Sequence, residues 1–190
     1  MGQVLKALGL FGGTFDPVHI GHLRTCVELR EYLDLSALHL VPCGVPPHRA
    51  SPRAAAHHRA AMLRLAIQGE PYLSVDEREV HQERESYSVH TLRALRQEFG
   101  PDLPLYWCIG MDALATLDTW YCWRQLTDYA HLAVVARPGW RRPTGGEVAE
   151  WLVDKITEDP AHLEQRSGGR VVICEMSQLP VSSTHIRELL

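Results

Sequence analysis

The residues best suited to chemistry lie in one segment near the N-terminus, Gly12-Gly13-Thr14-Phe15-Asp16-Pro17-Val18-His19-Ile20-Gly21-His22. Two adjacent glycines after an apolar run let backbone N–H groups approach an anion without a Cβ in the way. Asp16 is a favourable N-cap and Pro17 a favourable first helical residue, so we expect a helix to begin where its N-terminus could bind a phosphate. On that helix, His19 and His22 would share one face near the positive end of the dipole. The segment therefore predicts a site that handles phosphate.

Other interpretations of this segment are open to test. It is not a Walker A loop, because no Gly-Lys-Ser/Thr follows, and it is not the G-x-G-x-x-G dinucleotide motif. A zinc site would need a third ligand beside His19 and His22, and none stands out at matching spacing, so no protein metal site is predicted. A chance pair of surface histidines is the remaining alternative. Gly21 is costly inside a helix, but its missing side chain would let a ligand lie against the first turn.

The elements that must position these residues follow an alternating pattern. Short apolar runs alternate with segments of helical period, which predicts an α/β fold with a doubly wound, mostly parallel sheet. The predicted strands are Val4 to Phe11, Ala37 to Val41, Leu73 to Val75, Leu105 to Ile109, His131 to Ala136 and Val171 to Cys174. The predicted helices are Val18 to Leu33, Ala55 to Gln68, Val89 to Phe99 and Glu147 to Ile156. Ligands of such sheets bind beyond the carboxyl ends of the strands.

Composition narrows the class of protein. With 190 residues, 45% of them hydrophobic, the chain fits a single α/β domain. Lys6 and Lys155 are the only lysines, so arginine dominates the basic residues; arginine suits bidentate phosphate binding, although genome composition is an alternative cause. The five cysteines form no C-x-x-C pair, so we expect reduced thiols and neither zinc nor a redox centre.

Targeting and charge features point to a cytoplasmic protein. No signal peptide is evident, and nowhere do about 18 apolar residues run together, so we expect no membrane partner. The formal net charge of −4 argues against a dedicated nucleic-acid binder. The cluster of Arg137, Arg141 and Arg142 leaves RNA binding as a weak alternative. A homo-oligomer is compatible with the sequence, which does not fix the oligomeric state.

The His19-x-Gly-His22 element after a Gly-Gly-Thr-Phe-Asp loop resembles that of the nucleotidyltransferase superfamily, which includes adenylyl and cytidylyl transferases and is related to the much longer class I aminoacyl-tRNA synthetases. Together with four further segments, it resembles the bacterial nicotinate-nucleotide adenylyltransferases. The resemblance implies one Rossmann-like nucleotidyltransferase domain over residues 1–190. The further segments are Val45-Pro46-Pro47-His48-Arg49, Ser86-Tyr87-Ser88 with Thr91-Leu92, Ile109 to Asp112 leading to Thr119-Trp120-Tyr121-Cys122-Trp123, and Ser182-Ser183-Thr184-His185-Ile186-Arg187.

For the first substrate, the resemblance implies ATP with Mg²⁺ held mainly by its phosphates. Ser182 or Ser183 can cap a short final helix and leave Arg187 facing a triphosphate, although an ordinary capped helix with a surface arginine is an alternative. Asp112 would take ribose hydroxyls or, alternatively, cap a helix. The catalytic residues implied are His19, His22 and Arg187. The ATP-binding residues implied are Gly12, Gly13, Thr14, Phe15, His19, His22, Gly110, Asp112, Arg137, Ser182, Ser183, Thr184 and Arg187.

For the second substrate, the resemblance implies nicotinate mononucleotide. Trp120 offers a face for a pyridine ring, and backbone N–H groups near Trp120 and Tyr121 can hold a carboxylate, with the Ser88 hydroxyl in support. Without the resemblance, Trp120 and Trp123 would be interpreted as core aromatics. His48 and Arg49 would help to hold the mononucleotide phosphate; their alternative is a solvated loop charge.

The implied reaction gives nicotinate adenine dinucleotide and pyrophosphate. The attacking phosphate, with a second pKa of about 6, is mostly dianionic near pH 7 and needs no general base. The rival predictions are a transferase for nicotinamide mononucleotide, pantetheine phosphate or a cytidylyl substrate, and a catalytically silent nucleotide sensor. Two features depart from the family: His90 stands where an acidic or polar residue is usual, and the chain stops at Leu190, so it is either short or lacks C-terminal helices.

Overall fold

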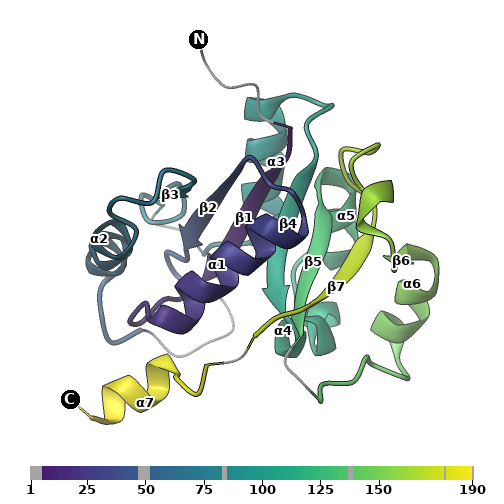
Figure 1. Ribbon diagram of the computed structural model, residues 1–190. Helices are drawn as coiled ribbons and strands as arrows, with labels where there is room; N and C mark the ends of the chain where they lie inside the picture. The colour runs from purple at the N-terminus through teal and green to yellow at the C-terminus, as the bar shows by residue number, and fades with distance from the viewer. Residues whose placement is uncertain (1–5, 47–51, 83–84, 137–138, 178, 190) are drawn as a thin grey trace.

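The fold is built on one parallel sheet. The computed structural model describes residues 6–46, 52–82, 85–136, 139–177 and 179–189 (Figure 1). Every strand pairing in this part of the chain is parallel, and the seven strands lie in the order β3-β2-β1-β4-β5-β7-β6. The strands are β1 (Leu8–Gly13), β2 (Ala37–Pro42), β3 (Leu73–Val75), β4 (Leu105–Gly110), β5 (His131–Ala136), β6 (Ile156–Thr157) and β7 (Val171–Glu175).

Helices cover both faces of the sheet, as the doubly wound prediction requires. Cys26 of α1 and Leu63 of α2 belong to the apolar core on one face, whereas Leu92 of α3 and Leu152 of α6 belong to the core on the other. The short α7 contributes no buried residue and lies apart from the sheet (Figure 1). The helices are α1 (Ile20–Tyr32), α2 (Ala56–Ala66), α3 (Ser88–Phe99), α4 (Met111–Ala115), α5 (Leu126–Tyr129), α6 (Glu147–Lys155) and α7 (Ser183–Glu188).

Strand β4 separates the two cores by the alternation of its side chains. Trp107 and Ile109 point into the core beneath α3, and Tyr106 and Cys108 point into the core beneath α1. All four side chains are nearly fully buried, which is why this strand is apolar along its whole length. Each face of β4 therefore packs against a different layer of helices.

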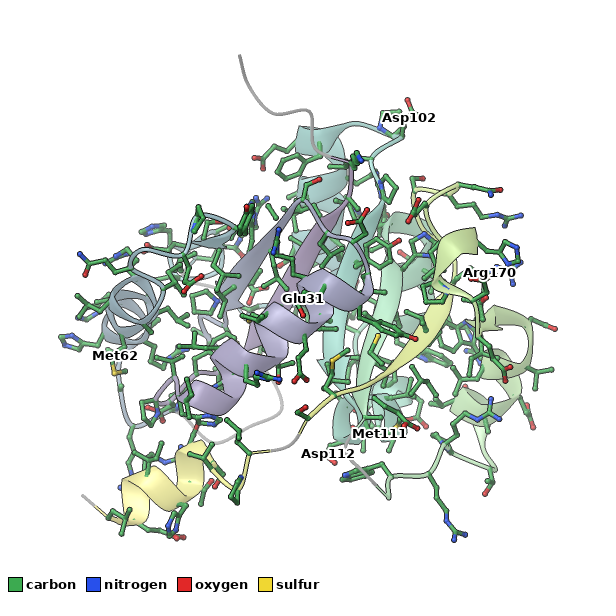
Figure 2. The ribbon with its side chains drawn as sticks, in the orientation of Figure 1. Glu31, Met62, Asp102, Met111, Asp112 and Arg170 are labelled. Atoms are coloured by element: carbon green, nitrogen blue, oxygen red, sulfur yellow. The ribbon has the colours of Figure 1, made fainter. Side chains whose placement is uncertain are left out.

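The strand order reverses direction between β1 and β4. From β1 the chain builds outward through β2 and β3, and from β4 it builds in the opposite direction through β5, β7 and β6. In open α/β sheets, ligands bind at such a point, in the crevice beyond the carboxyl ends of the strands. Figure 2 shows Met111 and Asp112 at that end of β4, and Asp102 at the opposite end of the sheet. The crevice therefore lies next to Gly13 and Asp112.

All six predicted strands are present, with local differences. Strand β1 continues to Gly13 rather than ending at Phe11, so both glycines belong to the strand. It begins at Leu8, so the prediction was wrong for Lys6 and Ala7, and the predicted start at Val4 lies outside the described residues. Strand β6 begins at Ile156, where the predicted helix was expected to end. The short helices α4 and α5 and the 3₁₀ turns were not predicted, because elements of three to five residues show no period. None of the helices in the described ranges is long and apolar enough to span a membrane.

Candidate active site

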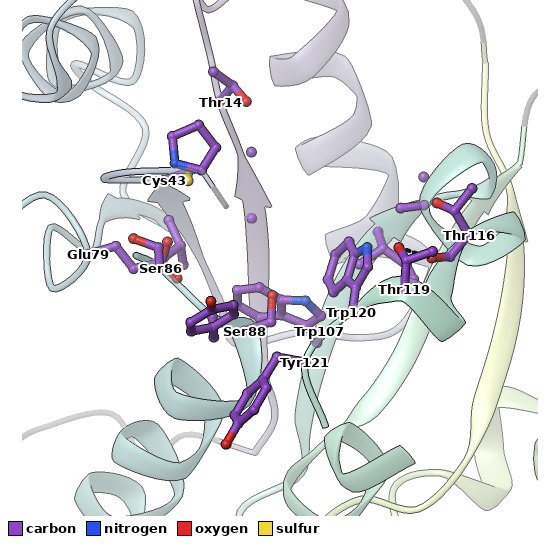
Figure 3. A pocket seen from close by; sticks show the side chains of 18 of the residues that line it. Thr14, Cys43, Glu79, Ser86, Ser88, Trp107, Thr116, Thr119, Trp120 and Tyr121 are labelled. Atoms are coloured by element: carbon purple, nitrogen blue, oxygen red, sulfur yellow. Dashed lines mark hydrogen bonds between the residues drawn. The ribbon is translucent and has the colours of Figure 1, made fainter. Parts of the chain in front are cut away.

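Two adjoining cavities open at the carboxyl ends of β1 and β4. The histidine cavity, of about 840 Å³, includes His19 and His22 in its lining. The tryptophan cavity, of about 580 Å³, includes Trp107 and Trp120 and lies on the α3 side of the sheet (Figure 3). The two cavities share the residues of their common boundary, so ligands in them would meet there. The shared residues are Gly12, Gly13, Thr14, Gly110 and Asp112.

The start of α1 differs from its prediction. The helix begins at Ile20, with His19 as its N-cap, so the expected roles of Asp16 as N-cap and Pro17 as first helical residue were wrong. The carboxylate of Asp16 instead accepts hydrogen bonds from the backbone N–H groups of Arg53 (2.8 Å) and Ala54 (3.1 Å). Because these two donors come from a distant segment, Asp16 joins the loop after β1 to the chain that leads into α2.

His19 and His22 form a stacked pair at the start of α1. Their ring centroids are 3.7 Å apart, and the backbone N–H of His19 donates to Nδ1 of His22 at 3.2 Å. This bond requires an unprotonated Nδ1, so the neutral His22 ring carries its proton on Nε2. Burial, followed by the nearby charge of His19, lowers the pKa of His22 to about 3. His22 is therefore a neutral hydrogen-bond donor at physiological pH.

Close packing explains two of the glycines in the segment. A Cβ at Gly12 would lie 2.8 Å from the ring of Trp107, and a Cβ at Gly21 would lie 3.0 Å from the ring of His19. The explanation expected for Gly21, room for a ligand, is thus incomplete, since the space is also needed by His19 and Val181. Both glycines keep a neighbouring ring in its position beside a cavity.

Helix α7 is fastened to the loop after β1 by side-chain hydrogen bonds. Ser182 caps the helix, accepting from the N–H of His185 at 3.1 Å, which confirms the predicted cap. Ser183 donates its hydroxyl proton to the carbonyl of Pro17 at 2.8 Å. Arg187 donates to the carbonyl of Asp16 and, at 3.0 Å, to the hydroxyl of Thr184. These contacts bring the C-terminal motif beside the histidines, although more than 160 residues separate them in sequence.

The structure brings the predicted ATP-binding residues together. Phe15 is almost fully buried, with its ring edge-on to His22 at 5.0 Å, so its side chain supports the histidine from behind. Arg137 lies outside the described residues. The predicted residues that line the histidine cavity are Gly12, Gly13, Thr14, Phe15, His19, His22, Gly110, Asp112, Ser182, Ser183, Thr184 and Arg187.

The predicted acceptor residues gather in the tryptophan cavity. Ser88, Trp120 and Tyr121 all line it, and Figure 3 shows them around one opening. The alternative interpretation of the two tryptophans as core residues holds for the buried Trp123 and in part for Trp120, which is half-buried and packs against the same core while lining the cavity. His48 and Arg49 lie outside the described residues. Asp112 lies in the first turn of α4 after the N-cap Gly110, so its alternative role as an N-cap was wrong.

Several residues of the two cavities were not predicted from sequence. Glu79, in the wall of the tryptophan cavity, is buried and accepts a hydrogen bond from Thr91 Oγ1 at 2.6 Å. Burial raises the pKa of the Glu79 carboxyl. Arg53 and Trp140 line the histidine cavity. No sequence signal marks them, because each is defined by the elements that fold around it rather than by its neighbours in the chain.

Arg59 of α2 holds the loops after β1 and β2 together. Its side chain is 1% exposed, and its guanidinium donates to the carbonyls of Thr14 (2.6 Å), Cys43 (2.5 Å) and Gly44 (3.1 Å). Thr14 lines both cavities, and Cys43 lines the tryptophan cavity. One buried cation therefore fixes the shared boundary and the wall next to it.

The residues around the histidine cavity are compatible with a magnesium ion carried by substrate phosphates. Within the described ranges, no group of three or more His, Cys, Asp or Glu residues could hold a metal ion. Asp112 is exposed at the boundary of the two cavities, whereas the Asp16 carboxylate is occupied by two N–H groups. Mg²⁺ commonly uses one or two carboxylates together with substrate phosphates, which this arrangement allows.

Comparison with known proteins identifies the class of this fold and site. A model of the cytidylyltransferase-like family matches residues 10–189, nearly the whole chain. The chain is 45% identical to a protein of Aeromonas salmonicida over 188 residues, covering 98% of this chain and 87% of that protein. It is 48% identical to a protein of Laribacter hongkongensis over 183 residues, covering 95% and 82%. Both relatives are named "probable nicotinate-nucleotide adenylyltransferase". Within the cytidylyltransferase-like class, the chain therefore belongs to the nicotinate-nucleotide adenylyltransferase family.

Solved structures share the fold at low sequence identity. The nicotinic acid mononucleotide adenylyltransferase of Plasmodium falciparum, complexed with NaAD, matches with a TM-score of 0.66 and 15% identity, covering 96% of this chain and 82% of that chain. The structure of a protein named "putative nicotinate-nucleotide adenylyltransferase" from Vibrio parahaemolyticus matches with a TM-score of 0.59 and 15% identity, covering 97% of this chain and 86% of that chain. The Rossmann-like nucleotidyltransferase fold expected from the resemblance is thereby confirmed.

Proposed function

We propose that this protein transfers AMP from ATP to nicotinate mononucleotide, releasing pyrophosphate and nicotinate adenine dinucleotide. The observation that carries the proposal is the joining of two cavities at the ends of β1 and β4, across Gly12 to Thr14, Gly110 and Asp112. A reaction between two bound nucleotides needs such a boundary, because the attacking oxygen must reach the α-phosphorus of ATP. The names of the relatives favour this reaction over the rival acceptors and over a silent sensor.

In this proposal, ATP occupies the histidine cavity. Its triphosphate would lie between the start of α1 and α7, near His22, Ser183 and Arg187, which line the cavity together. Asp112 at the boundary would accept hydrogen bonds from ribose hydroxyls. Arg137 in the Arg-Pro-Gly segment stays a predicted ATP contact. This placement puts the α-phosphorus beside the shared boundary, with the departing pyrophosphate near the histidines.

Nicotinate mononucleotide occupies the tryptophan cavity in the same proposal. Its pyridine ring would stack on Trp120, and its carboxylate would accept from Ser88 and from backbone N–H groups near Trp120 and Tyr121. His48 and Arg49 stay predicted contacts of the mononucleotide phosphate. That phosphate, mostly dianionic near pH 7 with a second pKa of about 6, can attack without a general base.

Rate enhancement would come from position and from neutralising charge. His22 offers Nε2–H as a neutral donor, since Nδ1 is occupied by the backbone N–H of His19. Arg187 supplies a permanent positive charge from α7. Donors fixed before the reaction stabilise the charge that develops on pyrophosphate as it leaves. Mg²⁺, held by the triphosphate, would supply further charge neutralisation. We further propose that the enzyme acts in the cytoplasm on small molecules alone, without a nucleic-acid partner.

A pyrophosphate-release assay tests the proposal. Purified protein with ATP and Mg²⁺ should release pyrophosphate with nicotinate mononucleotide at least tenfold faster, by kcat/KM, than with nicotinamide mononucleotide. The reason is that only the nicotinate acceptor carries a carboxylate for Ser88. A preference for nicotinamide mononucleotide, pantetheine phosphate or a cytidylyl substrate would show that nicotinate mononucleotide is not the acceptor. ATP binding without release with any acceptor would instead support a sensor.

A further inference from the structure

Trp107 presents an unusual polar group inside the tryptophan cavity. Its side chain is 2% exposed, yet its indole Nε1–H has no hydrogen-bond acceptor among the described residues. Buried Trp side chains usually find a partner for this N–H, because an unpaired buried donor is destabilising. Trp107 also lines the cavity, where Figure 3 shows its ring between Ser88 and Trp120. A buried, unpaired donor on a residue that lines a ligand cavity indicates a group that could pair with a ligand acceptor.

The ring of Trp107 is held firmly in place. Trp107 lies on β4, paired in register with Leu10 of β1, and its side chain packs in the core beneath α3. Its six-membered ring lies against the backbone of Gly12, where a Cβ would come within 2.8 Å. Because the glycine and the core fix the ring from two sides, the direction of the N–H is fixed before any ligand binds.

Two other polar groups of the cavity wall are already engaged. The Glu79 carboxylate accepts from Thr91 at 2.6 Å, and the Ser86 hydroxyl accepts from the N–H of Gly44 at 3.2 Å. Neither bonds to Trp107, whose N–H has no partner in the part of the chain that the structure describes. Because no described residue accepts from this N–H, we expect its acceptor to be a molecule in the cavity.

We propose that the indole N–H of Trp107 donates a hydrogen bond to the carboxylate of the pyridine ring of the acceptor mononucleotide. This inference rests on the proposed function, which places that ring on Trp120 and its carboxylate near Ser88. Trp107 lines the same cavity as both residues, so in this proposal its N–H and the Ser88 hydroxyl bind the same carboxylate (Figure 3). A neutral donor suits a carboxylate entering an aromatic cavity, because it pairs the ligand charge without burying a second one.

The variant Trp107→Phe removes the N–H and keeps an aromatic ring at the same place. We expect kcat/KM for nicotinate mononucleotide to fall roughly tenfold or more, through KM, because a hydrogen bond to a charged group is lost. The KM for ATP should stay within twofold of the wild-type value. With nicotinamide mononucleotide as acceptor, the loss should be several-fold smaller. Trp151→Phe is the matched control: the same chemical change on α6, where the indole packs edge-on against Trp123, should alter neither constant.

The outcomes separate this inference from the proposed function. A wild-type protein inactive on nicotinate mononucleotide would reject the proposed function itself. An active wild type with an unchanged Trp107→Phe variant would reject only the role of Trp107. An equal loss with both acceptors would place the bond on a group that they share, such as ribose or phosphate, and would overturn the carboxylate assignment.

A spectroscopic measurement on the wild-type protein keeps the inference testable if the variant does not fold. Labelling tryptophan with ¹⁵N gives one indole N–H signal for each of the five tryptophans. Single Phe variants of the other four tryptophans identify their signals, and the remaining signal belongs to Trp107. We expect the Trp107 signal to move downfield when nicotinate mononucleotide is added. The movement should be smaller with nicotinamide mononucleotide. No movement with the nicotinate acceptor would overturn the inference. The other four tryptophans are Trp120, Trp123, Trp140 and Trp151.

Discussion

The imidazole of His22 stacks on that of His19, with ring centroids 3.7 Å apart and an angle of 24° between the planes. The same two residues are joined by the backbone N–H of His19, which donates to His22 Nδ1. Two protonated rings at this separation would repel each other, and a protonated Nδ1 would lose its hydrogen bond. The pair therefore enforces a neutral His22 in the free protein and directs its remaining proton, on Nε2, away from the bonded edge.

The first prediction concerns the ionisation of His22. Since burial and His19 lower its pKa from 6.5 to about 3, the unfolded chain binds a proton between these values that the folded chain does not. The His22 contribution to the free energy of unfolding should therefore decrease as pH falls from about 6.5 toward 3. In ¹H–¹⁵N spectra of the free protein, the His22 ring signals should not shift between pH 8 and 5. A His22 titration with a midpoint near 6.5 would contradict this prediction.

The second prediction separates the two nitrogens of His22. In His22→Asn, the amide oxygen can replace Nδ1 as acceptor for the His19 N–H, but nothing replaces Nε2. We expect the variant to fold with a Tm near the wild-type value and to turn over about 100-fold more slowly or worse, the usual cost of losing one preorganised donor. His22→Gln, whose amide nitrogen can approach the position of Nε2, should retain more activity than Asn. Equal, near-wild-type turnover in both variants would show that His22 takes no part in catalysis.

How much the sequence predicts depends on how local each signal is. The strands β1, β2, β4, β5 and β7 are continuous apolar runs because both faces of the sheet are covered, so their positions were predictable from composition alone. Six of the strands and five of the helices were expected, including the short final helix, and the Gly12 to His22 segment was correctly placed at the carboxyl end of the first strand.

Non-local contacts explain the errors and omissions. Asp16 has the sequence features of an N-cap, but its carboxylate is taken by N–H groups at Arg53 and Ala54, some 37 residues away. Trp107 lies in an apolar run and gives no sign that its N–H faces a cavity. Glu79 lies in a segment without helical or strand period, and its carboxylate accepts a hydrogen bond from Thr91 of the distant helix α3. Each of these features depends on which distant element packs against the residue, which local patterning does not encode.

The third prediction concerns the buried guanidinium of Arg59. Arg59→Met keeps much of the side-chain volume but leaves the carbonyls of Thr14, Cys43 and Gly44 without their donor. We expect a loss of roughly 3 kcal/mol or more in the free energy of unfolding, because several buried acceptors become unsatisfied together. Urea denaturation measures this loss, and a raised KM for both substrates should accompany it, since Thr14 lines both cavities.

A neighbouring arginine of the same helix provides the control for Arg59. Arg64 forms an exposed ion pair with Glu77 and touches neither cavity. Arg64→Met should cost about 0–1 kcal/mol in the free energy of unfolding and leave both KM values unchanged, because exposed ion pairs contribute little. If the two variants lost similar amounts of free energy of unfolding, Arg59 would contribute no more than an exposed arginine of α2 and would not fix the loops.

The fourth prediction tests the wall of the tryptophan cavity without altering a side chain that touches substrate. A Cβ at Gly44 would overlap the carbonyl oxygen of Glu79, and the N–H of Gly44 donates to Ser86 Oγ at 3.2 Å. Gly44→Ala should therefore push apart two segments that line the cavity, lowering the free energy of unfolding by about 3 kcal/mol and raising the KM for nicotinate mononucleotide more than that for ATP.

Gly145→Ala is the matched control for Gly44, because a Cβ at Gly145 would meet nothing within 4 Å. This variant should change the free energy of unfolding by about 0.5 kcal/mol at most and neither KM. Urea denaturation and initial rates of pyrophosphate release on the two variants decide the matter. If Gly44→Ala matches its control in stability and in both KM values, the close contact with Glu79 does not define the cavity wall. If the free energy of unfolding falls while both KM values rise equally, the substitution disturbs both cavities. In that case, the wall next to Glu79 does not affect nicotinate mononucleotide binding selectively.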